Sequence, residues 1–371
     1  MGIYIHIPFC KQKCHYCDFH FSTSLKNKEE LIACLLKEIE IQKNYLNKEI
    51  VETIYFGGGT PSFLDAGEIR SILDKVYVEF AVIPNPEITL EGNPDDFTFE
   101  KLQELKQAGI NRLSIGIQSF NDVDLTWMNR AHTANQATKC VQDAKSLGFD
   151  NITIDLIYGL PEMTSEPWKI NLQKALDLDV QHISAYNLTV EPGTTLHHLV
   201  KTGKSKPLND EAGAEQFELL INTLENKNFK HYEISSFGKE GYFSKHNSSY
   251  WKRKFYLGIG PSAHSFNGNT RQWNVANNVK YVKAINDGVV PFELEKLSKT
   301  DKYNEYILLG LRTIWGCEFD YIKSEFGEEW LLNLKKQLFN YSDQMNIDEQ
   351  SFSLNHKGKA FADRIASELF V

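Results

Sequence analysis

The sequence predicts an α/β protein whose larger part is an open, partial barrel of six strand–helix units, followed by a smaller, mostly helical domain. Through the first half of the chain, short segments rich in β-branched residues alternate with segments of helical periodicity. Glycines or polar residues follow the short segments, and in parallel barrels functional side chains collect at that end of each strand. This alternation favours a parallel sheet, and six units are too few for a closed eight-stranded barrel.

Six segments are expected to be strands because each is short and rich in residues that favour extended backbone. They are Ile3–Ile7, Val51–Phe56, Glu87–Glu91, Arg112–Ile117, Ile152–Ile157 and His182–Asn187. Helices are expected between them, since apolar residues recur at helical spacing within Leu31–Ile39, Phe99–Leu105 and Asn135–Leu147. Gly109 and Gly148 follow two of these segments, at the position where a glycine often ends a helix.

The last seventy residues are expected to form a separate small domain. Its helices are expected over Tyr303–Arg312, Asp320–Phe326 and Glu328–Phe339, with a strand pair near Ile347–Leu354 and a final amphipathic helix over Lys357–Phe370. Helices followed by a small hairpin resemble a winged-helix unit. We therefore divide the chain into a core of residues 1–235, a connecting segment of residues 236–299 and a C-terminal domain of residues 300–371.

Composition limits the class of partner. The chain has 371 residues with 49 acidic and 40 basic side chains, so its formal charge is −9. The C-terminal segment from residue 300 carries 12 acidic and 8 basic side chains and no basic face. Both observations argue against nucleic acid as a partner. No apolar run reaches the roughly 18 residues of a membrane span, and no signal peptide is recognisable, so we expect a cytoplasmic protein without a transmembrane segment.

Three cysteines near the N-terminus are the most informative motif. Cys10, Cys14 and Cys17 have the spacing C-x3-C-x2-C and follow the first expected strand. Three thiolates on one loop can hold three irons of a [4Fe-4S] cluster and leave the fourth iron open for a ligand. A structural zinc site would need a fourth ligand, and disulfides would suit a secreted chain. The other three cysteines are isolated, and core packing is their expected role.

Polar residues at the strand ends indicate a binding site at the mouth of the barrel. The second strand runs into Gly57-Gly58-Gly59-Thr60-Pro61-Ser62, where glycines let a ligand approach the backbone and free N–H groups can bind a carboxylate. Later strand ends supply Glu91, Gln118 and Asp155, and Arg130 follows shortly after. Carboxylates can accept ribose hydroxyls, and an arginine can hold a carboxylate. An ordinary turn, helix caps or surface positions would explain each feature singly, but not their recurrence at one mouth.

The cysteine spacing resembles that of the radical S-adenosylmethionine (SAM) enzymes, in which SAM chelates the open iron. Over residues 3 to about 190 the motifs GGGTPS, EGNP, GIQSF, NRAH and IDLIYGLP are similar to those of the oxygen-independent coproporphyrinogen III oxidase group. The resemblance implies a partial barrel of the radical SAM type, a [4Fe-4S] cluster on the three cysteines, and SAM as a cofactor. The SAM contacts that it implies are Tyr4, Gly58, Glu91, Gln118, Arg130 and Asp155, while Tyr16, Gly59 and Thr60 match the place of a second SAM in the oxidase.

Three features resemble the heme chaperone branch of this group, the HemW proteins. Phe19 stands where the oxidase has a fourth cysteine, and only nine residues precede Cys10, where the oxidase has a long extension. The segment His246-Asn247-Ser248-Ser249-Tyr250-Trp251 resembles the HNxxYW motif. The resemblance implies that His246 ligates heme iron, with Tyr250 on the same helical face. An aromatic cluster that packs two domains together is the alternative, and His264 is a rival ligand.

These resemblances imply a heme chaperone that binds heme, a [4Fe-4S] cluster and SAM and passes heme to a recipient protein. They leave open a membrane-bound cytochrome as recipient, a peripheral position at the membrane and a homodimer. Coproporphyrinogen oxidation is not expected. The alternatives are the oxidase itself, a radical SAM oxidative decarboxylase of coproporphyrinogen III, and a radical SAM enzyme with another substrate.

Overall fold

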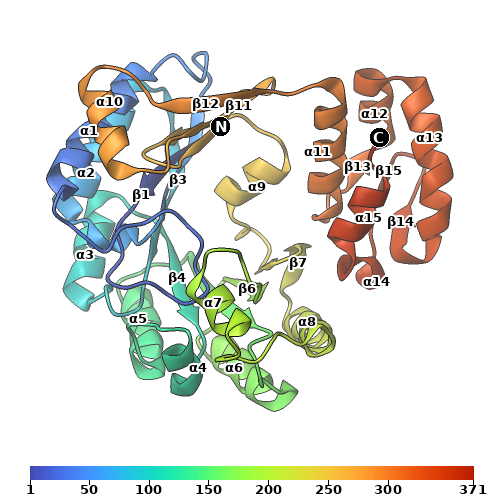
Figure 1. Ribbon diagram of the computed structural model, residues 1–371, viewed down its shortest axis with the longest axis horizontal. Helices are drawn as coiled ribbons and strands as arrows, with labels where there is room; N and C mark the ends of the chain where they lie inside the picture. Colours follow the sequence, from blue (N-terminus) through green and yellow to red (C-terminus); the bar gives the residue numbers. More distant parts are fainter.

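The computed structural model describes residues 1–371 and confirms the parallel sheet at the centre of the fold (Figure 1). Six strands lie side by side in chain order, and every neighbouring pair among them is parallel. They are β1 (Gly2–Ile7), β2 (Val51–Gly58), β3 (Val82–Gly92), β4 (Arg112–Gln118), β5 (Ile152–Tyr158) and β6 (His182–Asn187). In β1 the isoleucines Ile3, Ile5 and Ile7 are fully buried in the main core. Tyr4 and His6 alternate with them and face the inside of the curved sheet.

Helices cover the convex face of this sheet (Figure 1). The long ones are α1 (Lys28–Ile41), α2 (Ala66–Glu79), α3 (Phe99–Ala108), α5 (Ala134–Ser146), α6 (Ser165–Asp177) and α8 (Asp210–Glu225). Three short helices, η1 (Pro61–Phe63), α4 (Asp122–Trp127) and α7 (Thr195–Lys201), lie in the connections after β2, β4 and β6. Of these, α7 contacts the cysteine loop, where Leu196 N donates to the carbonyl of His15 at 2.7 Å. Gly109 caps α3 with φ 110°, and Gly148 follows α5 with φ 79°, so both adopt the left-handed conformation that glycine tolerates. The helices expected here are confirmed.

The sheet extends beyond the six expected strands at both edges, to twelve strands in all. Beside β6 lie β8 (Ser236–Gly238) and β7 (Lys230–Glu233). On the other side β9 (Tyr256–Ile259) runs parallel to β1, followed by antiparallel β10 (His264–Phe266), β11 (Thr270–Asn274) and β12 (Phe292–Lys296), with α10 (Asn278–Asn286) before β12. Most of these strands are shorter than the central ones, so they carry little periodicity. The chain division at residues 235 and 299 stays a prediction.

A buried carboxyl group fastens this extension to α1. Glu38 of α1 is fully buried. It accepts hydrogen bonds from Tyr281 Oη at 2.5 Å, Gly260 N at 2.8 Å, Asn274 Nδ2 at 2.7 Å and Gln42 Nε2 at 2.8 Å. Four donors around one carboxyl group satisfy it in a place where an unpaired charge would be costly. The β9–β10 turn, β11 and α10 are thereby held on the same helix.

The C-terminal residues form a second hydrophobic core of 17 buried side chains, from Tyr303 to Leu369. Its elements are α11 (Lys299–Leu311), β13 (Cys317–Glu318), α12 (Phe319–Phe326), α13 (Glu328–Leu338), η2 (Phe339–Gln344), β14 (Met345–Ile347) and β15 (Ser351–Leu354). The three strands form a small antiparallel sheet in the order β13-β15-β14. This succession of helices and strands is that of a winged-helix unit.

The single final helix expected over residues 357–370 is wrong, because two short helices take its place. They are α14 (His356–Lys359) and α15 (Ala362–Glu368). Phe361 between them has φ −118° and ψ 20°, outside the helical range. Gly358 lies so close to the backbone of Gln344 that a Cβ would fall 2.2 Å from its carbonyl oxygen. Packing against η2 therefore sets the direction of the chain here, which periodicity alone does not report.

Helix α9 (Lys245–Trp251) lies within the curve of the sheet (Figure 1). The backbone N–H groups of Lys245 and His246 donate to the carboxylate of Glu87 in β3, at 3.1 and 2.9 Å. At its other end, Trp251 lies under the guanidinium of Arg312, 5.4 Å from its ring centroid. Helix α9 thus connects the inside of the sheet with the C-terminal domain.

The structure contains no helix with both the length and the apolar composition that a membrane crossing requires.

Candidate functional site

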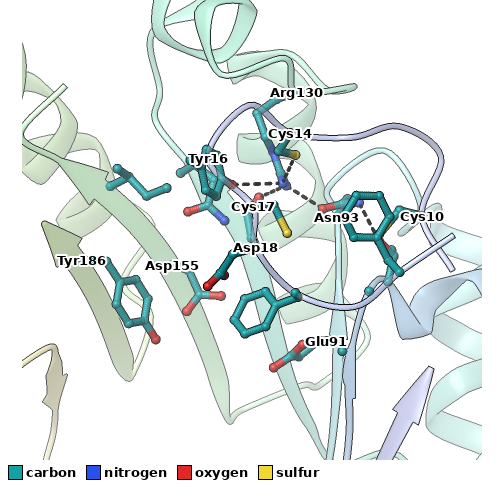
Figure 2. Close-up of a pocket in the computed structure, with 18 of the residues that line it drawn as sticks. Cys10, Cys14, Tyr16, Cys17, Asp18, Glu91, Asn93, Arg130, Asp155 and Tyr186 are labelled. Atoms are coloured by element: carbon teal, nitrogen blue, oxygen red, sulfur yellow. Dashed lines mark hydrogen bonds between the residues drawn. The ribbon is translucent and has the colours of Figure 1, made fainter. Parts of the chain in front are cut away.

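A cavity of about 410 Å³ opens at the C-terminal ends of strands β1–β6, within the range of small-molecule sites (Figure 2). The strand ends bring its lining together from segments far apart in the sequence, as parallel strands do. All twelve residues that the sequence suggested for the cluster and for SAM are among those that line it: Tyr4, Cys10, Cys14, Tyr16, Cys17, Gly58, Gly59, Thr60, Glu91, Gln118, Arg130 and Asp155.

The three cysteines lie on the loop between β1 and α1, and all are unpaired and half-buried. Two of the sulfurs accept hydrogen bonds: Thr60 Oγ1 donates to Cys10 Sγ at 3.3 Å and Arg130 Nη1 to Cys14 Sγ at 3.4 Å. Burial raises the pKa of the Cys10 and Cys17 thiols to about 11. These thiols are therefore protonated at neutral pH until a metal replaces the proton.

The donor set fits a cubane cluster better than a single metal ion. No group of three or more metal-ligating side chains converges on one point in the structure. A cubane cluster binds each thiolate at a different iron, so its ligands need not converge as those of one ion do. Arg130 and Thr60 supply positive charge and a hydroxyl donor next to two of the sulfurs, which suits the thiolate form.

Glycines in the segment after β2 let the chain pack closely against the cysteine loop. A Cβ on Gly59 would lie 2.8 Å from the carbonyl oxygen of Phe9 and 2.9 Å from its nitrogen. Gly58 has φ 112°, and a Cβ there would lie 2.7 Å from the His6 ring. The need for glycine at these two positions thus arises from packing within the protein, whatever ligand the free backbone groups bind.

Two carboxyl groups face the cavity, Glu91 from β3 and Asp155 from β5, with β4 between them. Burial is the main cause that raises the pKa of Glu91 to about 7 and that of Asp155 to about 6. Tyr55 Oη donates to Glu91 Oε1 at 2.6 Å, and Ser114 Oγ donates to Asp155 Oδ2 at 3.3 Å. These donors favour the charged form of each carboxyl and oppose the effect of burial. A ligand with hydroxyl groups or positive charge is the natural complement of this side of the cavity.

Arg130 ties the cysteine loop to the ends of β3 and β4. Its Nη2 donates to Asn93 Oδ1 at 2.5 Å and to the carbonyl of Gly116 at 2.6 Å, and its Nη1 contacts Tyr16 Oη at 3.4 Å (Figure 2). Its Nε is buried without a partner. At the end of β4, Gln118 has φ 68°, a strained value for a residue with a side chain and one that clusters at functional sites.

Sequence reasoning missed several residues of this site, above all Tyr55. A tyrosine in the middle of a strand looks like packing, and only the pairing of β2 with β3 brings its hydroxyl to Glu91. Asn93 and Ser114 are further polar residues of the lining that were not predicted. Asn93 belongs to the EGNP motif and Ser114 lies two residues before the GIQSF motif, and this was the one available signal.

His246 lies beneath the cavity and does not line it. Its side chain is buried, Nδ1 lies 2.8 Å from Thr53 Oγ1, and Nε2 lies 2.7 Å from Tyr250 Oη. Burial lowers the pKa of the imidazole to about 3. Tyr250 shares a helical face with His246, as the four-residue spacing predicts. Both ring nitrogens are engaged in this conformation, and the role of these two residues toward heme stays a prediction.

Comparisons with known proteins agree with these features. The family model described as Radical SAM superfamily matches residues 4–175. The heme chaperone HemW of Bacillus subtilis is 32% identical over 98% of this chain and 97% of its own. HemW of Lactococcus lactis is 33% identical over 95% and 94%. Among solved structures, coproporphyrinogen III oxidase (HemN) from Escherichia coli covers 100% of this chain and 90% of its own with a TM-score of 0.86; at 21% identity the likeness is one of fold.

Proposed function

Because the chain belongs to the HemW family within the radical SAM superfamily, we propose that it is a heme chaperone, which binds heme as cargo and passes it to a recipient protein. The observation that carries the proposal is the extent of the similarity. It spans 98% of this chain and 97% of the Bacillus subtilis heme chaperone, so it includes the C-terminal half with the HNxxYW segment.

Membership implies a [4Fe-4S] cluster and SAM as resident cofactors, and the cavity fits both. Cys10, Cys14 and Cys17 would hold three irons. Glu91 and Asp155 would accept the ribose hydroxyls of SAM. The unpartnered Nε of Arg130 is a buried donor suited to a carboxylate. When bound, a reduced cluster can supply an electron that cleaves SAM to a 5′-deoxyadenosyl radical.

Phe19 favours the chaperone over the oxidase. It occupies the place of the fourth cysteine of the oxidase motif, and its ring lines the cavity while remaining 67% exposed. A phenyl group can neither ligate iron nor exchange protons, so chemistry that depends on a thiol at this place is lost. The likeness to HemN concerns the fold and therefore does not favour the oxidase.

The recipient of the heme would be an apoprotein, and a membrane-bound cytochrome is the candidate. A second copy of the chain is a separate candidate partner, in a homodimer. A cytoplasmic chaperone that serves a membrane-bound recipient would act at the membrane surface. Size-exclusion chromatography with and without heme would reveal a dimer, and sedimentation with vesicles would reveal peripheral binding.

The decisive experiment reconstitutes the cluster anaerobically and assays two activities on one preparation. Hemin is titrated while the Soret band is followed, and coproporphyrinogen III is incubated with SAM and a reductant. The proposal predicts saturable heme binding, transfer of heme to an apocytochrome and no decarboxylation. Decarboxylation without heme binding would instead establish the oxidase, and neither activity would point to a radical SAM enzyme with another substrate.

A further inference from the structure

His264 differs from the other histidines of the chain in two ways taken together: its ring nitrogens make no hydrogen bond, and its ring stacks on an aromatic side chain. Seven of the eleven histidines engage at least one ring nitrogen in a hydrogen bond. The four that make none are His197, His198, His264 and His356. Of these four, only His264 stacks on an aromatic ring: Trp273 lies at a centroid distance of 6.0 Å, with 29° between the planes.

The strand register places His264 on the same face of the sheet as the cavity. Tyr4, which lines the cavity, pairs with Gly258 of β9, and Tyr256 lies two residues before Gly258 on the same face. Tyr256 pairs with Phe266 of β10, and His264 lies two residues before Phe266. Since side chains alternate along a strand and paired residues share a face, His264 points to the inside of the curved sheet.

His264 is the first residue of β10 and lies near the mouth of the barrel. The β9–β10 turn packs on the end of β1, because a Cβ on Gly260 would lie 2.7 Å from the carbonyl oxygen of His6. The ring of His20, from the loop that follows the cysteines, stacks on His6 at 6.1 Å. His264 therefore belongs to the rim that the cysteine loop also forms, while its side chain remains exposed.

The two candidate ligands differ in what iron binding would require. His246 would have to leave Thr53 or Tyr250 and come out of a buried site. His264 needs no rearrangement, because its side chain is exposed and neither ring nitrogen makes a hydrogen bond. Trp273 holds one face of its ring and restricts its orientation.

We infer that His264 is the axial ligand of the heme that the protein carries, with Trp273 as the residue that positions its ring. The inference rests on the proposed function, since it requires heme as cargo. It assigns the cargo to the rim of the sheet extension, outside the cavity of the cluster and SAM.

The test titrates hemin into the full-length protein and into His264→Ala, following the Soret band and the electron paramagnetic resonance spectrum. We expect His264→Ala to lose the imidazole-ligated spectrum and to bind heme at least about tenfold more weakly. Added imidazole should restore the spectrum. His356→Ala, which removes another exposed histidine without a hydrogen bond, should match the wild type. Trp273→Leu should keep the ligated spectrum and broaden it, because the ligand remains while its support is gone.

The outcomes separate this inference from the proposed function. If the wild type binds no heme, the chaperone function fails. If the wild type binds heme and His264→Ala keeps its spectrum and affinity, the assignment of the ligand is wrong while the chaperone function stands. If His264→Ala is unchanged and His246→Ala loses the imidazole-ligated spectrum, the axial ligand is His246 of α9. Cluster absorbance and circular dichroism of His264→Ala report whether the variant is folded.

Discussion

His246 stacks on Tyr55, with ring centroids 4.9 Å apart and 26° between the planes. Tyr55 in turn donates its hydroxyl hydrogen bond to Glu91, at 2.6 Å. Only the Tyr55 ring therefore separates the imidazole from Glu91, which lines the cavity, and a change at His246 reaches this carboxyl group through one aromatic ring. The HNxxYW segment and the expected SAM site are parts of one packed unit.

Replacing His246 with alanine should weaken SAM binding. Aromatic pairs contribute about 0.5–1.5 kcal/mol beyond simple burial, so loss of the stack should reduce SAM affinity roughly two- to tenfold. Isothermal titration calorimetry under anaerobic conditions measures this. His231→Ala is the matched control, because His231 is also buried and stacked, on Phe237 at 4.2 Å, and does not line the cavity. Equal SAM affinities in the two variants would separate α9 from the SAM site.

SAM affinity should fall as the pH is lowered through about 7, the pKa to which burial raises the Glu91 carboxyl group. Protonation removes the charged acceptor that the ribose hydroxyls require. In Tyr55→Phe the midpoint should move to higher pH, since the lost hydroxyl donated to the charged form and held the pKa down. Titrations from pH 6 to 9 measure both midpoints. A midpoint that does not move in Tyr55→Phe would contradict the coupling, and Glu91→Gln should lack this midpoint.

Changing Cys14 to serine should abolish the visible absorbance of the reconstituted cluster, because a hydroxyl is a poor ligand for iron in a cluster. Cys34→Ser and Cys140→Ser should keep it, since both cysteines are buried in helices α1 and α5, among core side chains. Iron and sulfide analyses accompany the spectra. A full complement of iron and sulfide in Cys14→Ser would remove Cys14 from the ligand set.

Replacing Glu38 with glutamine should destabilise the fold by about 2–4 kcal/mol. All four partners of the carboxyl group are donors, so the amide NH₂ of glutamine would face two of them without an acceptor, and each unsatisfied buried group costs roughly 1–3 kcal/mol. Urea unfolding measures the loss. Glu40→Gln is the control on the same helix, where the side chain is 59% exposed and pairs with Lys75. A Glu38→Gln midpoint equal to that of the control would show that the network contributes little.

The central fold was predictable because its signals are local. The six parallel strands carry β-branched residues, and the helices between them repeat apolar residues at helical spacing. The edges of the sheet were not predictable in this way, since every side chain of β12 is exposed and no alternation marks it. The break at Phe361 depends on contacts with η2, which lie outside the periodicity of the segment itself.

The site was predictable to the same degree and for a related reason. Strand ends converge at one edge of a parallel sheet, so the sequence alone predicts that the cysteine loop, Glu91 and Asp155 lie together. The buried position of His246 could not be predicted, because it depends on contacts with Thr53 and Tyr55, nearly two hundred residues away in the chain. A motif read in isolation suggests an exposed ligand, whereas packing places it in the interior.

Helix α9 closes the partial barrel on the side away from the mouth of the cavity. Below Tyr4, the side chains that meet α9 are buried, Thr53, Tyr55 and Glu87 among them, and His246 is only 1% exposed. A ligand of the cavity would therefore enter and leave past the cysteine loop and not past α9.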